Sequence, residues 1–279
     1  MLDCMRRTRR LVARGSGALV LLALMSACAG STETAEDPGW SPVALTGEAG
    51  DLPEGRDVVR RVIDFMQAQD QLAFEAVATY EVVQHNGQKL QFDMLQRVAL
   101  DRPQRLYWVT LHDDAGSETA WLADGTFTMV RQPANVWGQV TVPPTLTAGV
   151  SRIAEDYEVP VPFVDLLSGE AAELWLGPDV EWVDYVGEAW VDGQWTDYVA
   201  LRGPGADVQL WFRQGDEPFP VKMAIVHRDE DGLPKFSARF RQWSTQIPDG
   251  AIPQFVPPEG SEQLEIVPVT ETLTAGGSR

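Results

Sequence analysis

The sequence predicts a protein of the α+β class that is mainly antiparallel β, with about eleven strands, an N-terminal helix and helices inserted into the sheet. Apolar and polar residues alternate with a period of two over many short segments, as in half-buried strands. Asn86-Gly87, Asp124-Gly125 and Asp192-Gly193 each separate two such segments. These pairs favour tight hairpins because both residues tolerate positive φ. Helical spacing of apolar residues occurs before the first strand and again within residues 143–176.

The chain begins with the features of a bacterial export signal. Five arginines lie between Arg6 and Arg14, and an apolar stretch runs from Ala18 to Met25. This stretch is too short to span a bilayer, which requires about 20 apolar residues, so it is typical of a signal peptide. The run Met25-Ser26-Ala27-Cys28 resembles the lipobox of bacterial lipoproteins. Residues 1–27 are therefore predicted to be a lipoprotein signal peptide and Cys28 the lipid-bearing residue, with a plain signal or an uncleaved anchor as alternatives.

Cysteine content agrees with this interpretation. Cys4 and Cys28 are the only cysteines, so the mature chain can form no internal disulfide and must be stabilised by a hydrophobic core. Alanine follows Cys28, where aspartate is the usual signal for retention in the inner membrane of enteric bacteria. The expected location is therefore the outer membrane, facing the periplasm, and inner-membrane anchoring is less favoured. The membrane is thus the first expected partner, through the lipid anchor.

The chain is strongly acidic, with a net charge of −19. Removal of residues 1–27 takes away five arginines and Asp3, which leaves 17 basic and 40 acidic residues and a net charge of −23. Such a surface repels nucleic acid and anionic lipid headgroups and favours cationic partners. A solvated surface without any partner is the simpler interpretation.

Both ends of the mature chain look loose. Residues 28–54 are rich in Gly, Pro, Ser, Thr and acids and have no sustained periodicity, which is typical of a flexible tether. Residues 269–279 have a similar composition and are interpreted as a loose C-terminal tail. A single domain is expected over residues 55–268.

The expected elements follow from the periodicity. A helix is predicted to start near Asp51 or Leu52, with one apolar side that includes Val58, Val62 and Met66. Two or three short helices are expected between Pro143 and Leu176. The predicted strands are Phe74–Val82, Leu90–Leu100, Arg105–His112, Thr119–Ala123, Thr126–Arg131, Val136–Val142, Glu181–Val191, Gln194–Arg202, Asp207–Arg213, Val221–Arg228 and Lys235–Trp243. Helices on one side of such a sheet either fill its concave face as core or leave a cavity for an apolar guest.

Six short stretches occur in the same order in a family of predicted periplasmic proteins of unknown function, which the chain resembles over roughly residues 55–268. The stretches are Asn86–Phe92, Arg102–Leu106, Asp124–Thr126, Val159–Leu167, Gly215–Lys222 and Phe255–Gly260. That family is similar to the superfamily of LolA, LolB and RseB. The resemblance implies an unclosed half β-barrel whose concave face is covered by the helices. It also implies relatives that carry the acyl chains of lipoproteins or sense envelope components, although one fold hosts several functions.

No catalytic site, metal site or cofactor is predicted. His85, His112 and His227 lie far apart in the sequence, without the spacing of a zinc pair, and are interpreted as surface or edge residues. The acidic clusters Asp113-Asp114 and Asp229–Gly232 are interpreted as solvated turns, because the second lacks the ligand spacing of an EF-hand. Neither a phosphate-binding glycine loop nor a nucleophile elbow is present.

An apolar ligand site is predicted on one face of two strands. Leu90, Phe92 and Met94 share a face of one strand, and Leu106 and Trp108 share a face of the next. Eight tryptophans lie on or beside predicted strands, where packing within the core is the simpler role. A register error of one residue would move the whole set to the other face.

Two functions remain open. The favoured one is a membrane-tethered, non-catalytic carrier or sensor that binds a lipid, an acyl chain or a lipidated ligand in the half-barrel. The alternative is an interaction module whose barrel is filled by its own side chains, with an edge strand or an acidic face that recruits another envelope protein.

Overall fold

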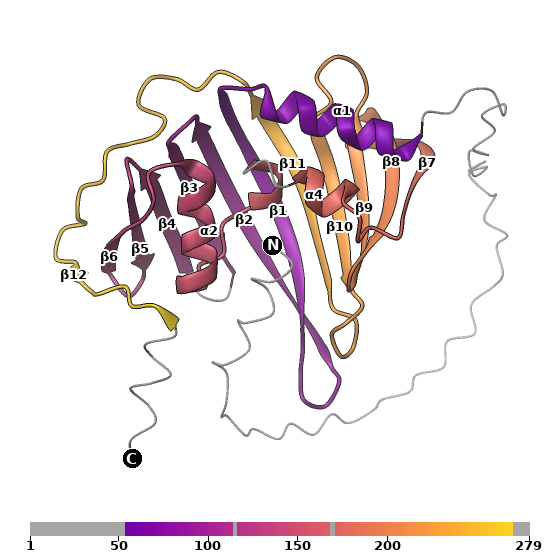
Figure 1. Cartoon of the computed structure of the whole chain (residues 1–279). Coiled ribbons are helices and arrows are strands. Elements are labelled where there is room, and N and C mark those ends of the chain that lie inside the picture. The colour runs from indigo at the N-terminus through magenta and orange to yellow at the C-terminus, as the bar shows by residue number, and fades with distance from the viewer. Residues whose placement is uncertain (1–53, 114–115, 168–170, 270–279) are drawn as a thin grey trace, which may run out of the picture.

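The computed structural model describes residues 54–113, 116–167 and 171–269. They form one curved, twelve-stranded sheet with helices on its concave side (Figure 1). In chain order the elements are α1 (Gly55–Gln67), β1 (Gln71–Val83), β2 (Lys89–Asp101), β3 (Arg105–His112), β4 (Gly116–Ala123), β5 (Thr126–Gln132), β6 (Val136–Thr141), α2 (Leu146–Tyr157), α3 (Val164–Leu167), α4 (Ala171–Leu176), β7 (Trp182–Val191), β8 (Gln194–Gly203), β9 (Ala206–Arg213), β10 (Pro220–His227), β11 (Lys235–Ser244) and β12 (Glu262–Gln263).

The strand order in the sheet is β12-β6-β5-β4-β3-β2-β1-β11-β10-β9-β8-β7. Pairing of β1 with β11 joins the half built from β1 to β6 to the half built from β7 to β11. The strands at the two ends, β12 and β7, do not pair with each other. The predicted unclosed, mainly antiparallel sheet with an N-terminal helix and inserted helices is therefore confirmed.

The predicted start of the first helix was wrong. Glu54 is extended (φ −66°, ψ 135°), and α1 begins at Gly55; Asp51 and Leu52 lie outside the described residues. Gly55 packs against the backbone of β7, and a Cβ there would lie 2.6 Å from the carbonyl carbon of Asp184. The apolar side of α1 was predicted correctly, since Val58, Val62 and Met66 are all buried.

The β1–β2 hairpin forms as predicted, but its turn differs from the expected type. Gln84 N–H donates to the carbonyl of Gln88, so three residues lie between the bonded pair, and among them only Gly87 has positive φ. Gln88 N–H also donates to the side-chain oxygen of Asn86 at 2.9 Å, which stabilises Asn86 without a left-handed conformation. At Asp124-Gly125 and Asp192-Gly193 both residues have positive φ, as a two-residue hairpin requires.

Three short helices, α2, α3 and α4, lie between β6 and β7, as predicted for residues 143–176. Together with α1 they cover much of the concave face (Figure 1). Their buried residues belong to the same core as those of the sheet.

The twelfth strand was not predicted. After β11 the C-terminal segment (residues 251–268) reaches the β6 edge, where β12 pairs with β6 in parallel. A strand as short as β12 shows no alternation of apolar and polar residues that could be detected in the sequence. Its position depends on contacts that other residues of the C-terminal segment make. Of the predicted tail, residues 270–279 lie outside the described residues, as do the predicted signal peptide and nearly all of the tether.

Candidate functional site

The five predicted ligand residues all lie on the concave face. In the β1–β2 ladder Phe92 is opposite Tyr80 and Met94 is opposite Ala78. In the β2–β3 ladder Val98 is opposite Trp108 and Leu100 is opposite Leu106. Residues opposite one another in a ladder share a face of the sheet, so Leu90, Phe92, Met94, Leu106 and Trp108 are on the side of the helices.

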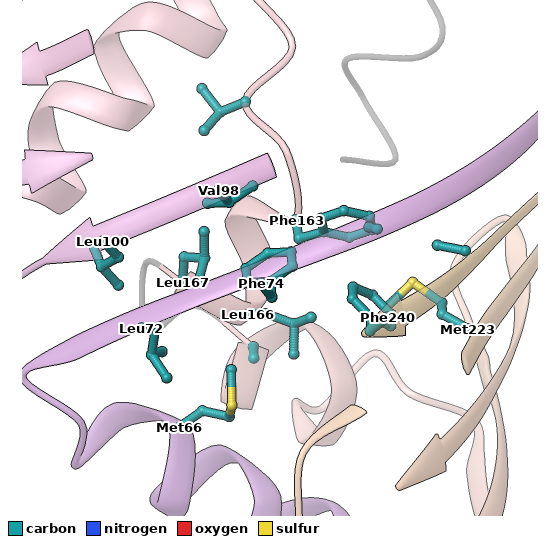
Figure 2. Close-up of a cluster of buried hydrophobic side chains, with 14 of the residues drawn as sticks. Met66, Leu72, Phe74, Val98, Leu100, Phe163, Leu166, Leu167, Met223 and Phe240 are labelled. Carbon is teal, nitrogen blue, oxygen red and sulfur yellow. The ribbon is translucent and has the colours of Figure 1, made fainter. Parts of the chain in front are cut away.

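Side chains of the segment inserted between β6 and β7 fill the middle of this face. Figure 2 shows Phe163, Leu166 and Leu167 among side chains of β1 and β2. The ring of Phe163 lies 5.7 Å from that of Phe74 and 4.7 Å from that of Phe240. This part of the concave face is therefore packed core.

Leu106 and Trp108 belong to the packed part. Both are 1% exposed, and the ring of Trp108 stacks on Phe127 at 6.0 Å. A ligand can touch them only if the side chains that cover them move.

Of the other three predicted residues, Met94 is half-buried against the core, and Phe92 and Leu90 follow it toward the hairpin loop. The β1–β2 hairpin extends well past the helices (Figure 1), and Val82, Leu90, Phe92 and Met94 lie along its concave face. We call these four residues the open strip. Leu90 is 36% exposed, and the rest are half-buried. The apolar face thus continues beyond the helices that cover it.

A buried polar pair lies between the open strip and the packed part. Gln96 Nε2 donates to Thr110 Oγ1 at 3.3 Å, while Gln96 Oε1 is buried and accepts no hydrogen bond from the described residues. An unsatisfied buried carbonyl oxygen is costly, and a hydroxyl or amide of a ligand would satisfy it. The prediction from sequence missed Gln96, although it is the one polar residue among the alternate positions from Leu90 to Leu100.

A polar pocket of about 130 Å³ lies elsewhere, beside the start of β1. It is lined by Gln71, Asp101, Arg105 and residues 247–252, and Arg105 forms an ion pair with Asp101. Because these side chains belong to the opposite end of the β1–β2 ladder from the hairpin loop, the pocket is separate from the open strip.

The histidines do not form a site. His85 is exposed in the β1–β2 loop, and His112 is half-buried at the end of β3. His227 is 5% exposed at the end of β10, so its interpretation as a surface or edge residue was wrong. Met223, Ile225 and His227 occupy alternate positions of β10 and are all buried, so the three side chains are on the core side of the strand. Among the residues that the structure describes, no three His, Cys, Asp or Glu side chains are grouped to hold a metal ion.

A phenol with a perturbed pKa, that of Tyr185, belongs to β7. Burial, together with the carboxylates of Asp197 and Glu188, raises the pKa of Tyr185 to about 12. Arg61 of α1 forms an ion pair with Asp197 at 2.7 Å. These contacts attach α1 to the β7–β8 hairpin.

Residues 55–267 match the family described as "Predicted periplasmic protein (DUF2092)". The chain belongs to this family. The resemblance inferred from the six stretches is therefore confirmed, and a periplasmic location follows from the family. No curated protein matches the sequence. None of the described helices is both long enough and apolar enough to cross a membrane.

Several solved structures are similar in fold. An uncharacterised conserved protein from Thermus thermophilus is 12% identical, with 75% of this chain and 98% of that chain covered and a TM-score of 0.42. The Mycobacterium tuberculosis lipoprotein LppX is 14% identical over 70% of this chain and 97% of that chain, with a TM-score of 0.41. The LolA superfamily protein NE2245 from Nitrosomonas europaea is 9% identical over 73% and 99%, with a TM-score of 0.29.

Proposed function

We propose that this protein is a non-catalytic periplasmic binding protein, a carrier or a sensor, that holds an acyl chain or a lipidated ligand against the concave face. The observation that carries the proposal is the open strip, whose apolar side chains continue the core face along the β1–β2 hairpin, and this hairpin extends past the helices in Figure 1. The chain as a whole is highly acidic, with a net charge of −19, and an apolar strip on such a protein favours an apolar guest.

The open strip is where the ligand enters. Burial of each methylene group contributes about 0.8 kcal/mol, so contact with six to eight methylenes gives roughly 5–6 kcal/mol before the cost of association. Gln96 Oε1, at the inner end of the strip, accepts a hydrogen bond from a hydroxyl or amide of the ligand. Apolar walls with few polar groups are typical of ligand sites.

Leu106 and Trp108 form the deeper part of the proposed site. They contact the ligand after the segment that contains α2, α3 and α4 moves, so that an acyl chain replaces Phe163 beside Phe74. In this proposal residues 143–176 act as a lid whose own side chains occupy the site in the absence of ligand.

Anchoring completes the proposal. Cys28, which lies outside the described residues, carries the lipid, and the tether holds the domain near the outer membrane on its periplasmic side. Replacement of Cys28 by Ser should abolish both the incorporation of labelled palmitate and fractionation with membranes. If both persist, the protein is anchored in another way.

A fluorescent fatty acid, cis-parinaric acid, tests the site, and native mass spectrometry of the purified protein detects a lipid that co-purifies with it. Leu90→Asp places a charge on the open strip and should weaken binding of the probe by about tenfold or more. Leu111→Asp is the matched control, since Leu111 is 42% exposed on the convex face of β3. Equal binding by the two variants would argue against the strip as the site.

The second candidate is an interaction module with a self-filled barrel, which the complete burial of Leu106 and Trp108 favours. Phe163→Ala distinguishes the two functions. If residues 143–176 are a lid, cis-parinaric acid should fill the space that the Phe163 ring leaves in this variant, and the probe should bind more tightly. If the barrel is filled for stability alone, this variant should lose about 3 kcal/mol or more of unfolding free energy without gaining affinity.

A further inference from the structure

The edge strand β7 has a hydrogen-bonded neighbour on one side only within the described sheet. It is ten residues long, and its side chains alternate between exposed and half-buried, so that none is buried. A strand of this length leaves a row of backbone donors and acceptors available to an added strand.

The exposed tryptophans of the described residues gather on the β7–β8 hairpin. Trp182 is 39% exposed, Trp190 60% and Trp195 49%. The rings of Trp190 and Trp195 lie edge to face at 5.3 Å. Tryptophan is among the residue types most enriched in the side chains that dominate binding energy at protein interfaces, so this edge combines backbone groups with aromatic contact surface.

The charged residues of β7 itself and of the residues that flank it are all acidic. Residues 179–192 contain five acidic residues and neither Lys nor Arg. Arg228 pairs with Glu181, and Arg239 pairs with Asp192. The two acids within the strand proper, Asp184 and Glu188, form no ion pair with the described residues.

A β-bulge limits which segments can pair with this edge. The register of β7 on β8 shifts between Tyr185 and Gly187, where Gly187 has a φ of 137°. Pairing in a straight line is therefore confined to one side of the bulge. On the far side of the bulge, Glu188 and Trp190 are two positions apart and lie on one face of the sheet. An added strand would therefore match them with a basic side chain beside Glu188 and an apolar side chain beside Trp190, at alternate positions.

We propose that the β7 edge docks an extended cationic segment of another periplasmic protein, which adds a strand to the sheet beside Glu188 and Trp190. Main-chain hydrogen bonds supply affinity, and the acidic and aromatic side chains of the edge select the partner. Charge argues against a second copy of this chain at this edge, since like charges would face each other, and against an anionic lipid surface. This docking is independent of the open strip, which lies on the β1–β2 hairpin.

The test uses the full mature chain with Cys28→Ser and the acetylated, amidated peptide Lys-Thr-Val-Thr-Lys-Thr-Val-Thr, which carries Lys and Val two positions apart. Hydrogen exchange should show protection of the β7 amides when the peptide is bound. The same peptide with alternate residues N-methylated keeps its charges but lacks half of its donors, and should bind at least about tenfold more weakly. Equal binding by the N-methylated peptide, or protection of β6 in place of β7, would overturn the proposal.

Charge reversal on the two edges gives the matched pair of variants. Glu188→Lys on β7 should weaken peptide binding several-fold, whereas Glu262→Lys on β12, with the same change in net charge, should leave it unchanged. Equal weakening would mean that the peptide responds only to net charge, and would overturn the assignment to β7. Two further results would overturn the proposal if the peptide gives the β7 amides no protection from hydrogen exchange. Burial of the hairpin tryptophans in neutral lipid vesicles would favour a membrane as the partner. Dimerisation through β7 would favour a second copy of this chain.

Discussion

The two edges of the sheet are treated differently by the same chain. At the β6 edge, the C-terminal segment packs Phe255 against Trp121 and Trp137, at 5.4 and 5.1 Å, and then adds β12 in parallel. At the β7 edge, the described residues add no strand, and three tryptophans stay exposed.

An unclosed sheet has two edges that can pair with other chains, and natural proteins usually protect them. Here the C-terminal segment protects one edge by its own backbone, whereas the other edge, within the part of the chain that the structure describes, gains no added strand and carries acidic residues and a bulge. This contrast is what our proposal for the β7 edge rests on, with the β6 edge covered for stability and the β7 edge used for binding. Substitutions on the two edges should therefore differ in what they change.

Deletion of residues 251–279 should have the largest effect. The deletion removes Phe255, β12 and the bonds from Leu264 N–H to the Trp137 carbonyl and from Trp121 Nε1 to the Pro253 carbonyl. We expect a loss of roughly 3–4 kcal/mol in the free energy of unfolding, measured with urea, and self-association through the bare β6 edge. An undiminished free energy of unfolding in a monomeric protein would show that the segment does not protect this edge.

Phe255→Ala should have the next largest effect. Phe255 is half-buried between two indole rings, so its truncation should cost about 2 kcal/mol of unfolding free energy. Val256→Ala is the control, because Val256 is 75% exposed and should change the free energy by less than about 0.5 kcal/mol. Similar losses in both variants would mean that the aromatic contact is not what holds the segment.

Gly138→Ala tests how closely the C-terminal segment approaches β6. A Cβ on Gly138 would lie 2.6 Å from Ile266 Cγ1 and 2.9 Å from the Leu264 carbonyl oxygen. Displacement of the segment should cost about 1–2 kcal/mol, measured by urea unfolding. Gly203→Ala on β8 is the control, since a Cβ there meets nothing within 4 Å, and it should be close to neutral.

Trp190→Ser on the open edge should have the smallest effect on stability. Its ring is 60% exposed, so the free energy of unfolding should change by no more than about 0.5 kcal/mol, while affinity for the cationic peptide should fall. A loss of stability comparable to that of Phe255→Ala would remove the distinction between the two edges.

The sequence indicated much of the fold because its signals are local. Alternation in β2 and β3 placed Leu90, Phe92, Met94, Leu106 and Trp108 on one face, and the ladders show that face to be the concave one. The Asp-Gly turns identified two hairpins in the same way. The start of α1 was misplaced because it depends on Gly55 meeting the backbone of β7, a residue pair that is distant in the chain.

The candidate site was only half predictable. Periodicity shows that a side chain faces the core side, but it does not show whether another element covers it. Thus Trp108 and Leu90 look equivalent in the sequence, although one is 1% and the other 36% exposed. Gln96 could have been recognised as a polar residue in an apolar series, but its lack of a partner could not.

By itself the sequence determined the family, the class of fold, the hairpins and the faces of the strands, because neighbouring residues in one strand or turn fix these features. The tertiary structure decided which part of the apolar face is packed by Phe163 and which part is left open, and which edge of the sheet the C-terminal segment covers. These outcomes depend on contacts between residues that are distant in the chain, such as Phe74 with Phe163 and Trp121 with Phe255, and such contacts leave no periodic pattern in the sequence.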